Sequence, residues 1–340
     1  MIESVHPKDK ITVIAEAGVN HNGDFTKALE LIDVAADCGA DVIKFQTFKA
    51  TNLVTASAGL AAYQATTTPY SDQFTMLTDL ELKYEWHQSL IEHAESKSIG
   101  FITTPFDVEA IAFLSQLRME LFKIPSGEIT NLPYLREISK LGKRVILSTG
   151  MAKLGEIETA IEVLTSNGLD RNKITLLHCT TEYPAPIEEV NLSVMETLKI
   201  AFNMPVGYSD HTEGITISIA AAAMGAQIIE KHFTLDRRLP GPDHKASIEP
   251  DELNKMIDAI RQVEQAIGSP LKQPTPSELK NMESVRKSLV ASKNIVKGER
   301  FSLDNVTTKR PANGISPMRI DEIIGRVAHK SFERDELISV

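Results

Sequence analysis

The stretch "IIEKHFTLD", residues 228–236, begins as a buried β-strand and then departs from that pattern. After two isoleucines, a glutamate, a lysine and a histidine stand where a buried strand normally carries apolar side chains. Charged side chains are rarely buried unless they are paired or serve a function. The stretch therefore predicts a strand whose polar side chains face a functional site.

Seven other short runs rich in Val, Ile and Phe precede this strand, and stretches with helix-like apolar spacing separate them. The runs span residues 11–18, 41–47, 100–106, 121–126, 144–150, 174–180 and 205–211. Continuous apolar strands that alternate with helices indicate a parallel sheet covered on both faces. Eight such units predict an α/β fold of the closed (β/α)8 type, a TIM barrel, and an open doubly wound sheet is the alternative. The long segment 48–82 is expected to cover a site.

The composition limits what the protein can bind. The 340 residues carry a net charge of −10 and no basic run, which argues against a nucleic-acid surface. No apolar run approaches the roughly 18 residues that span a bilayer, and the first residues lack a signal-peptide pattern. We therefore expect a cytoplasmic protein with a small-molecule partner, no nucleic acid and no membrane. Cys38 and Cys179 are interpreted as buried thiols and not as a disulfide framework.

Polar residues gather near the carboxyl ends of the predicted strands. They are Glu16, Lys44, Gln46, Thr104, Lys123, Ser126, Glu128, Ser148, His178, Tyr183, Ser209, His211, Glu230 and His232. In a barrel these ends converge on one mouth, where active sites of this architecture are built. The alternative is that each is a hydrogen-bonded polar group of the core, but its recurrence in nearly every strand favours a site.

His211 and His232 end two strands that are neighbours in the predicted barrel. Two imidazoles without a nearby cysteine suit a divalent cation that remains partly open to water and substrate. A hydrogen-bonded histidine pair without metal is the competing interpretation.

A second group combines two lysines with hydroxyl groups: Lys44, Lys123, Thr104, Ser126, Ser148 and Ser209. It suits a phosphate or carboxylate held in a dry pocket, and a lysine that forms a Schiff base is the alternative. Glu16 and Glu128 supply carboxylates that could bind sugar hydroxyls or move protons.

The amino-acid composition of the chain changes after the last predicted barrel helix. Residues 1–268 are predicted to be the barrel domain, and the polar, proline-containing residues 269–285 a linker. Residues 286–340 form a predicted small β-rich domain in which "ASKNIVKGERF" from Ala291 and "AHKSFERDELI" from Ala328 are a faint repeat. Between its halves a turn-rich segment contains Arg310.

Nine stretches, taken together, resemble the sialic acid synthase family. They are "AEAGVNHNGD", "KFQTFKA", "STGM", "FKIPSGEITNLPYL", "LLHCTTEYPAP", "GYSDHT", "IEKHFTLD", "GPDHKASIEP" and "KRPANGIS". Members of this family condense phosphoenolpyruvate with N-acetylmannosamine-type sugars to give nonulosonic acids. The resemblance covers nearly the whole chain and implies a barrel, an antifreeze-like (SAF) domain and a domain-swapped homodimer.

The resemblance also implies roles for individual residues. It implies a divalent metal, Mn, Mg or Co, on His211 and His232, and phosphoenolpyruvate on Lys44, Gln46, Thr104, Lys123, Ser126, Ser148 and Ser209. The sugar would meet Glu16, Glu128, Tyr183 and Asp243, and Arg310 would come from a second subunit. Glu128, Glu16, Lys44 and Lys123 are the expected catalytic residues, with Glu128 handling a proton near the new bond.

The identity of the sugar depends on finer similarities. The stretch "AYQ" at residues 62–64, "GMAKLGEIE" and "CTTEYPAPIEEVNL" resemble members that make N,N′-diacetyllegionaminate. This favours 2,4-diacetamido-2,4,6-trideoxymannose over N-acetylmannosamine. Thr180-Thr181-Glu182-Tyr183-Pro184 departs from the "TNxYP" pattern of some sialate synthases, so contacts at the Asn position do not transfer.

Overall fold

The structure is a computed structural model that describes residues 10–61, 64–65 and 68–340. The chain divides into two compact units, Met1–Gly268 and Ser269–Val340. Ala62 and Tyr63 of the stretch "AYQ" lie outside the described residues.

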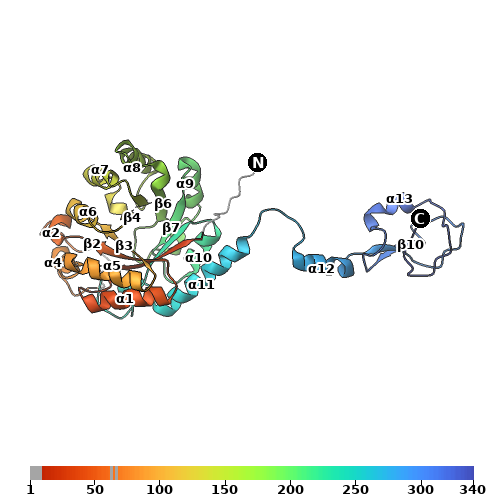
Figure 1. The fold of residues 1–340 in the computed structure, drawn as a ribbon, viewed down its shortest axis with the longest axis horizontal. Helices are drawn as coiled ribbons and strands as arrows, with labels where there is room; N and C mark the ends of the chain where they lie inside the picture. The colour runs from red at the N-terminus through yellow and green to blue at the C-terminus, as the bar shows by residue number, and fades with distance from the viewer. Residues whose placement is uncertain (1–9, 62–63, 66–67) are drawn as a thin grey trace. The chain divides into compact units, whose positions relative to one another are not determined.

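Within the described residues, the first unit is built on one sheet of eight parallel strands (Figure 1). They are β1 (Thr12–Gly18), β2 (Val42–Thr47), β3 (Gly100–Pro105), β4 (Leu121–Ile124), β5 (Arg144–Ser148), β6 (Ile174–Cys179), β7 (Val206–Asp210) and β8 (Ile228–His232). The order is β3-β2-β1-β8-β7-β6-β5-β4, and the terminal strands β3 and β4 are also neighbours, which closes the barrel. The predicted TIM barrel is confirmed, and the open-sheet alternative is wrong.

Helices follow the strands and surround the barrel (Figure 1). They are α1 (Phe25–Asp37), α2 (Ala50–Leu53), α4 (Gln73–Asp79), α5 (His87–Ser96), α6 (Val108–Leu114), α7 (Leu132–Lys140), α8 (Leu154–Ser166), α9 (Val194–Phe202), α10 (Thr216–Ala223) and α11 (Pro250–Ile267). Helix α1 shows why they form: the Asp24 side chain accepts hydrogen bonds from the backbone N–H groups of Thr26 and Lys27. Its buried residues are Ala28, Leu31, Ile32 and Ala35, one apolar stripe that faces the sheet.

The last barrel strand, β8, contains buried polar residues. All five residues of β8 are buried, including Glu230, Lys231 and His232. Ile228 and Ile229 at its start belong to the apolar core. The polar end of this strand is therefore surrounded by protein, so its charges need partners inside the barrel.

The second unit has a small core of its own. It contains α12 (Pro276–Val285), β9 (Ser288–Ala291), the antiparallel β10 (Val306–Lys309), the short 3-10 helix η6 (Pro317–Arg319) and α13 (Ile320–Ile323). Ile295 and Phe332, which occupy equivalent positions of the repeat, pair through two backbone hydrogen bonds of 2.9 and 2.8 Å. The two copies thus face one another across an approximate twofold axis.

The segment predicted as a linker is partly helical. In α12 the Thr275 hydroxyl accepts a bond from the Glu278 N–H, and the Glu278 carboxylate accepts one from the Thr275 N–H. This capping box, with Pro276 in the first turn, starts a helix that polar composition alone does not indicate. In the described parts of the chain, no helix is long and apolar enough to cross a membrane.

Candidate active site

A cavity of about 250 Å³ lies at the carboxyl ends of the barrel strands. The structure brings eleven of the predicted site residues to its wall: Glu16, Lys44, Gln46, Thr104, Lys123, Ser126, Ser148, Tyr183, Ser209, His211 and His232. Glu230 lies among them. These strand-end residues therefore surround one cavity, because parallel strands in a barrel bring their carboxyl ends to one mouth.

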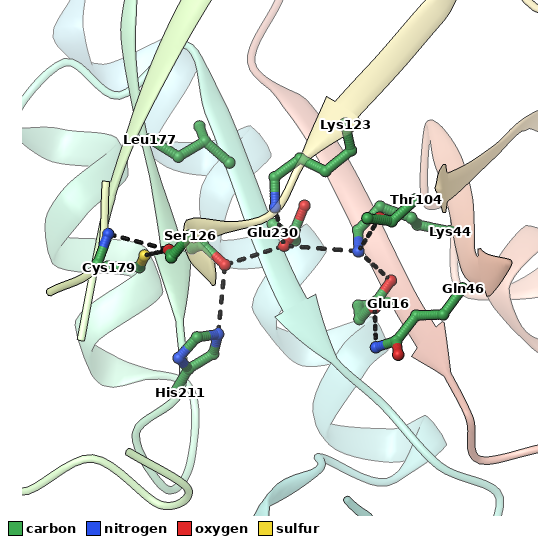
Figure 2. A network of polar contacts seen from close by, with 12 residues as sticks. Glu16, Lys44, Gln46, Thr104, Lys123, Ser126, Leu177, Cys179, His211 and Glu230 are labelled. Carbon is green, nitrogen blue, oxygen red and sulfur yellow. Dashed lines mark hydrogen bonds and ion pairs between the residues drawn. The ribbon is translucent and has the colours of Figure 1, made fainter. Parts of the chain in front are cut away.

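Charge in the pocket is organised around Glu230 (Figure 2). Its Oε1 atom lies 3.1 Å from Lys123 Nζ and 3.8 Å from Lys44 Nζ, and it accepts a 2.9 Å hydrogen bond from the Ser209 hydroxyl. Lys44 Nζ also lies 2.7 Å from Glu16 Oε2. Two ammonium groups and two carboxylates thus share one buried cluster, which makes their burial tolerable.

Two further polar groups complete this side of the cluster. Lys44 donates a 3.2 Å hydrogen bond to the Thr104 hydroxyl, and the Gln46 amide donates a 3.3 Å bond to Glu16 Oε1. Lys44 and Gln46 project inward from β2 because they alternate with Phe45, which belongs to the core.

The two carboxylates differ in their affinity for protons. Burial raises the pKa of Glu16 to about 7, with Glu230 adding to the rise and Lys44 opposing it. Burial also acts on Glu230, but Lys123 and Lys44 outweigh it and lower the pKa of that carboxyl to about 2. Likewise, Glu16 and Glu230 outweigh the effect of burial on Lys44 and raise its pKa. At neutral pH the cluster therefore contains a fixed anion, Glu230, and a carboxyl, Glu16, that can bind or release a proton.

Sequence reasoning placed Glu230 at the mouth but gave it no role. The signal was its two-residue spacing from His232, which puts both side chains on the inner face of β8.

His178 was predicted at the barrel mouth, and the structure does not place it there. It is on β6 but is not in the pocket wall, and its Nε2 atom makes a 2.6 Å hydrogen bond to the carbonyl of Val190. Its neighbour Cys179 takes the inward position instead.

The wall around Ser126 is tightly packed. The Ser126 hydroxyl accepts a 2.9 Å hydrogen bond from the Gly150 N–H and lies 3.2 Å from the Cys179 thiol (Figure 2). A Cβ atom on Gly150 would approach the Ser126 hydroxyl to 2.8 Å and would also collide with Thr181. Glycine is thus required here for steric reasons, and its N–H sets the position of the Ser126 hydroxyl.

The two histidines are neutral and close together. Burial lowers the pKa of His211 to about 4 and that of His232 well below its usual value. Their ring centroids are 5.6 Å apart, and the Tyr183 ring lies 4.2 Å from His211 and 5.7 Å from His232. His211 Nδ1 lies 2.6 Å from the carbonyl of Thr180, so it carries the proton, and the unprotonated Nε2 atom lies 3.4 Å from the Ser209 hydroxyl.

This donor set fits a divalent cation in part. Within the part of the chain that the structure describes, the buried Nδ1 atom of His232 has no hydrogen-bond partner, and Asp243 Oδ2 is 3.9 Å away. Two neutral imidazoles suit such an ion. Among the described residues, however, no group of three or more His, Cys, Asp or Glu side chains is arranged to hold a metal. A cation here would take its other ligands from water or substrate.

Besides His178, three predicted residues lie outside the pocket wall. Glu128, in the 3-10 turn η2 (Ser126–Glu128), is half-buried and accepts a 2.5 Å hydrogen bond from the Asn131 amide. Burial raises the pKa of the Glu128 carboxyl. Asp243 is buried near His232, and burial raises its pKa to about 6. Arg310 belongs to the second unit, so the barrel by itself does not contain it.

The chain is similar to known proteins over almost its full length. Residues 31–272 match the model of the NeuB family, and residues 286–339 match that of the SAF domain. The N,N′-diacetyllegionaminic acid synthase of Campylobacter jejuni subsp. jejuni serotype O:2 is 58% identical over 97% of this chain and 99% of that protein. The enzyme of the same name from Legionella pneumophila subsp. pneumophila is 46% identical over 92% of this chain and 89% of that protein.

A solved structure is also similar. The N-acetylneuraminic acid (sialic acid) synthetase from Leptospira borgpetersenii serovar Hardjo-bovis, crystallised with citrate, matches with a TM-score of 0.72 and 36% identity. The match covers 81% of this chain and 91% of that chain. From the barrel, its polar mouth and these matches we conclude that the chain is an enzyme of the NeuB family and carries a SAF domain.

Proposed function

We propose that this enzyme condenses phosphoenolpyruvate with open-chain 2,4-diacetamido-2,4,6-trideoxymannose to give N,N′-diacetyllegionaminate and phosphate. The 58% identity to the C. jejuni N,N′-diacetyllegionaminic acid synthase, over nearly the full length of both chains, carries the proposal. The buried cluster of lysines, hydroxyls and histidines supports the reaction class, because it suits an anionic substrate beside a Lewis-acid site.

The lysine side of the pocket would bind phosphoenolpyruvate. Lys44 and Lys123 are at most 4% exposed, so their charges act on an anion with little screening by water. Hydrogen bonds from Gln46, Thr104, Ser126, Ser148 and Ser209 would fix its carboxylate and phosphate. Since Glu16 and Glu230 already neutralise both lysines, the incoming anion would be favoured by protonation of Glu16, whose pKa is about 7.

The histidine side would bind the aldehyde end of the sugar. His211 Nε2 and His232 would hold a divalent ion, Mn, Mg or Co, which when bound would polarise the aldehyde oxygen. Thr180 fixes the ring of His211 through its carbonyl, and Tyr183 covers both imidazoles. Asp243, buried beside His232, would bind a sugar hydroxyl. This arrangement would orient the aldehyde towards the phosphoenolpyruvate site.

The bond changes then follow from the substrates. The methylene carbon of phosphoenolpyruvate would attack the aldehyde carbon, water would add to the resulting cationic carbon, and phosphate would leave with cleavage of its carbon–oxygen bond. The added water would lose a proton and the aldehyde oxygen would gain one. Glu16 is better placed than Glu128 to transfer it, since it lines the pocket and its pKa lies near neutrality. Glu128 would instead act at the outer end of the sugar.

We further propose that the enzyme works as a domain-swapped homodimer in which the SAF domain of one chain serves the barrel of another. Eleven of the predicted residues line the barrel pocket, but Arg310 is in the second unit. Under this proposal a second copy of the chain supplies Arg310 to the sugar.

Three other functions are alternatives to this proposal. An N-acetylneuraminate synthase that uses N-acetylmannosamine is supported by the similarity to the Leptospira enzyme. A Schiff-base aldolase is disfavoured, because a lysine nucleophile needs a lowered pKa and the pKa of Lys44 is raised. A carbohydrate-binding module without catalysis would not need the buried lysine cluster.

A competition assay tests the proposal. The purified enzyme receives phosphoenolpyruvate, Mn²⁺ and an equal mixture of the two sugars, and both nonulosonic acids are quantified together with phosphate. We expect kcat/KM to be at least ~10-fold higher for the diacetamido sugar, since a mismatched polar group or an unfilled space costs that much. Equal or better use of N-acetylmannosamine would identify a sialate synthase, and absence of phosphate release would exclude both.

A further inference from the structure

A buried ion pair lies directly behind the two candidate metal histidines. The side chains of Asp210 and Lys231 are both 0% exposed, and Lys231 Nζ lies 3.1 Å from Asp210 Oδ2. They are opposite one another in the parallel ladder of β7 and β8. Each immediately precedes a histidine, His211 or His232, so each points to the other side of the sheet from the pocket.

The pair also fixes the residue that follows His211. Asp210 Oδ1 accepts hydrogen bonds from the N–H of Thr212 at 2.9 Å and from its hydroxyl at 2.8 Å. Lys231 donates a 2.5 Å bond to the carbonyl of Thr212. Three polar groups of Thr212 are therefore held by one ion pair, and His211 lies between two anchored residues. Ser218 supports the arrangement with a 2.6 Å hydrogen bond to Asp210 Oδ2.

The position of His232 depends on the Asp210–Lys231 pair more strongly than the position of His211 does. The ring of His211 is oriented by the carbonyl of Thr180, whereas the buried Nδ1 atom of His232 has no hydrogen-bond partner in residues 10–61, 64–65 and 68–340. The position of the His232 ring is consequently set by its main chain and its packing. Lys231, the preceding residue, ties that main chain to the strand of His211.

Stability alone does not account for a fully buried ion pair. Taking two charges out of water is expensive, and apolar residues of similar volume are often at least as stable in the same place. We infer that Asp210 and Lys231 are positioning residues that set the separation of His211 and His232 and thereby the affinity of this site for a divalent cation. The inference rests on the proposed function only in taking the two histidines as metal ligands.

The test compares Mn²⁺ affinity in matched variants of the full chain. The double variant Asp210→Asn/Lys231→Met removes both charges at nearly constant volume, so no uncompensated buried charge remains. The dissociation constant for Mn²⁺ is measured without substrates, from the electron paramagnetic resonance signal of free Mn²⁺, and folding is followed by thermal unfolding. We expect a dissociation constant at least ~10-fold higher, as is typical when groups that orient metal ligands are lost.

An ion pair at the other end of the barrel provides the control. Arg261 in α11 pairs with Asp41, which precedes β2, at 2.5 Å. Arg261→Met should lower the unfolding temperature and leave the Mn²⁺ affinity within about twofold of wild type. If Asp210 and Lys231 served only stability, their double variant would behave in the same way.

Three outcomes would overturn the inference: a double variant with wild-type Mn²⁺ affinity, an equal loss of affinity in Arg261→Met, or a wild-type chain that does not bind Mn²⁺.

If the double variant fails to fold, Ser218→Ala replaces it. Loss of the one hydrogen bond from Ser218 to Asp210 should weaken Mn²⁺ binding about fivefold. Unchanged affinity in that variant counts equally against the inference. Because no sugar is present, failure of the sugar assignment would leave the Mn²⁺ result unchanged.

Discussion

The carboxylate of Glu230 lies 3.1 Å from the ammonium group of Lys123 inside the barrel mouth, and both side chains are at most 5% exposed. Lys44 approaches the same oxygen to 3.8 Å. Each charge makes the burial of the others tolerable, so a change at one position alters the whole cluster.

Removal of the Glu230 charge should destabilise the protein in the absence of substrate. Glu230→Gln leaves Lys44 and Lys123 with Glu16 as the remaining carboxylate, and the free energy of unfolding should fall by about 3 kcal/mol. Phosphoenolpyruvate would supply the missing negative charge, so it should raise the unfolding temperature more in this variant than in wild type. Thermal unfolding with and without the ligand measures both effects.

The control for this prediction is a surface ion pair. Glu120 lies 2.6 Å from Lys143, and its side chain is 79% exposed. Glu120→Gln should change stability by less than about 1 kcal/mol. A Glu230 variant that is as stable as this control, with no added effect of ligand, would contradict the proposed charge balance.

The Glu16 carboxyl should make stability depend on pH. Its pKa is about 7 in the folded protein and 4.5 in an unperturbed carboxyl, so the folded state binds more protons between these values. Stability should therefore fall as pH rises from about 4.5 to about 7, by up to about 3 kcal/mol from this group. Glu16→Gln should flatten that part of the curve, as measured by urea unfolding at several pH values.

Glu230 should act in a different pH range and in the opposite direction. Its pKa of about 2 means that its contribution to stability is present above about 4.5 and is lost as pH falls towards 2. Glu230→Gln should thus weaken the acid sensitivity below pH 4.5. Identical slopes in both variants would show that these carboxyls do not titrate as the structure indicates.

Loss of either pocket histidine should abolish turnover. His211→Ala or His232→Ala removes half of the proposed cation site, and because both residues lie at the mouth the fold should remain nearly intact. Turnover is measured as phosphate release, and folding by circular dichroism. His93→Ala is the control, since His93 pairs with Asp33 outside the pocket. Full activity in either pocket variant would remove the metal assignment.

Chelation should separate the synthase from a Schiff-base aldolase. Treatment with EDTA should stop phosphate release, and added Mn²⁺ should restore it, because the aldehyde would no longer be polarised without the ion. Borohydride in the presence of substrate should not label Lys44 or Lys123 covalently. Undiminished turnover after EDTA, or a labelled lysine, would favour the aldolase.

The second unit should be necessary for activity. A chain lacking residues 286–340 retains the barrel with its own core and should be folded but inactive, because Arg310 is absent. Mixing it with full-length His211→Ala should restore some turnover, since each chain would supply what the other lacks. Turnover by the truncated chain alone would refute the role of this domain and of the swapped dimer.

The strands and their polar ends could be predicted from the sequence because both are local properties. The seven predicted runs that precede residue 228 match the strands of the barrel to within two residues at either end, as a comparison of residues 121–126 with β4 (Leu121–Ile124) illustrates. Alternation along β8 likewise places Glu230 and His232 on one face without further information. The sequence also contains the capping box of α12, at Thr275 and Glu278. The helix was not predicted because the polar composition of this segment indicated a linker.

Only the tertiary structure decided which of these residues meet. Lys123 and Glu230 are 107 positions apart, and the closure of the barrel brings them to 3.1 Å. The register between β7 and β8 pairs Asp210 with Lys231 behind the histidines. The register between β6 and β7 sets Cys179 opposite Ser209 on the pocket face and leaves His178 on the other face. Periodicity fixes the face of each strand, but the register between strands and the choice of partner depend on how the whole sheet closes. The sequence by itself therefore determined the barrel and the polar character of its mouth, and the three-dimensional closure determined the charge pairs that give each side chain its pKa and its position.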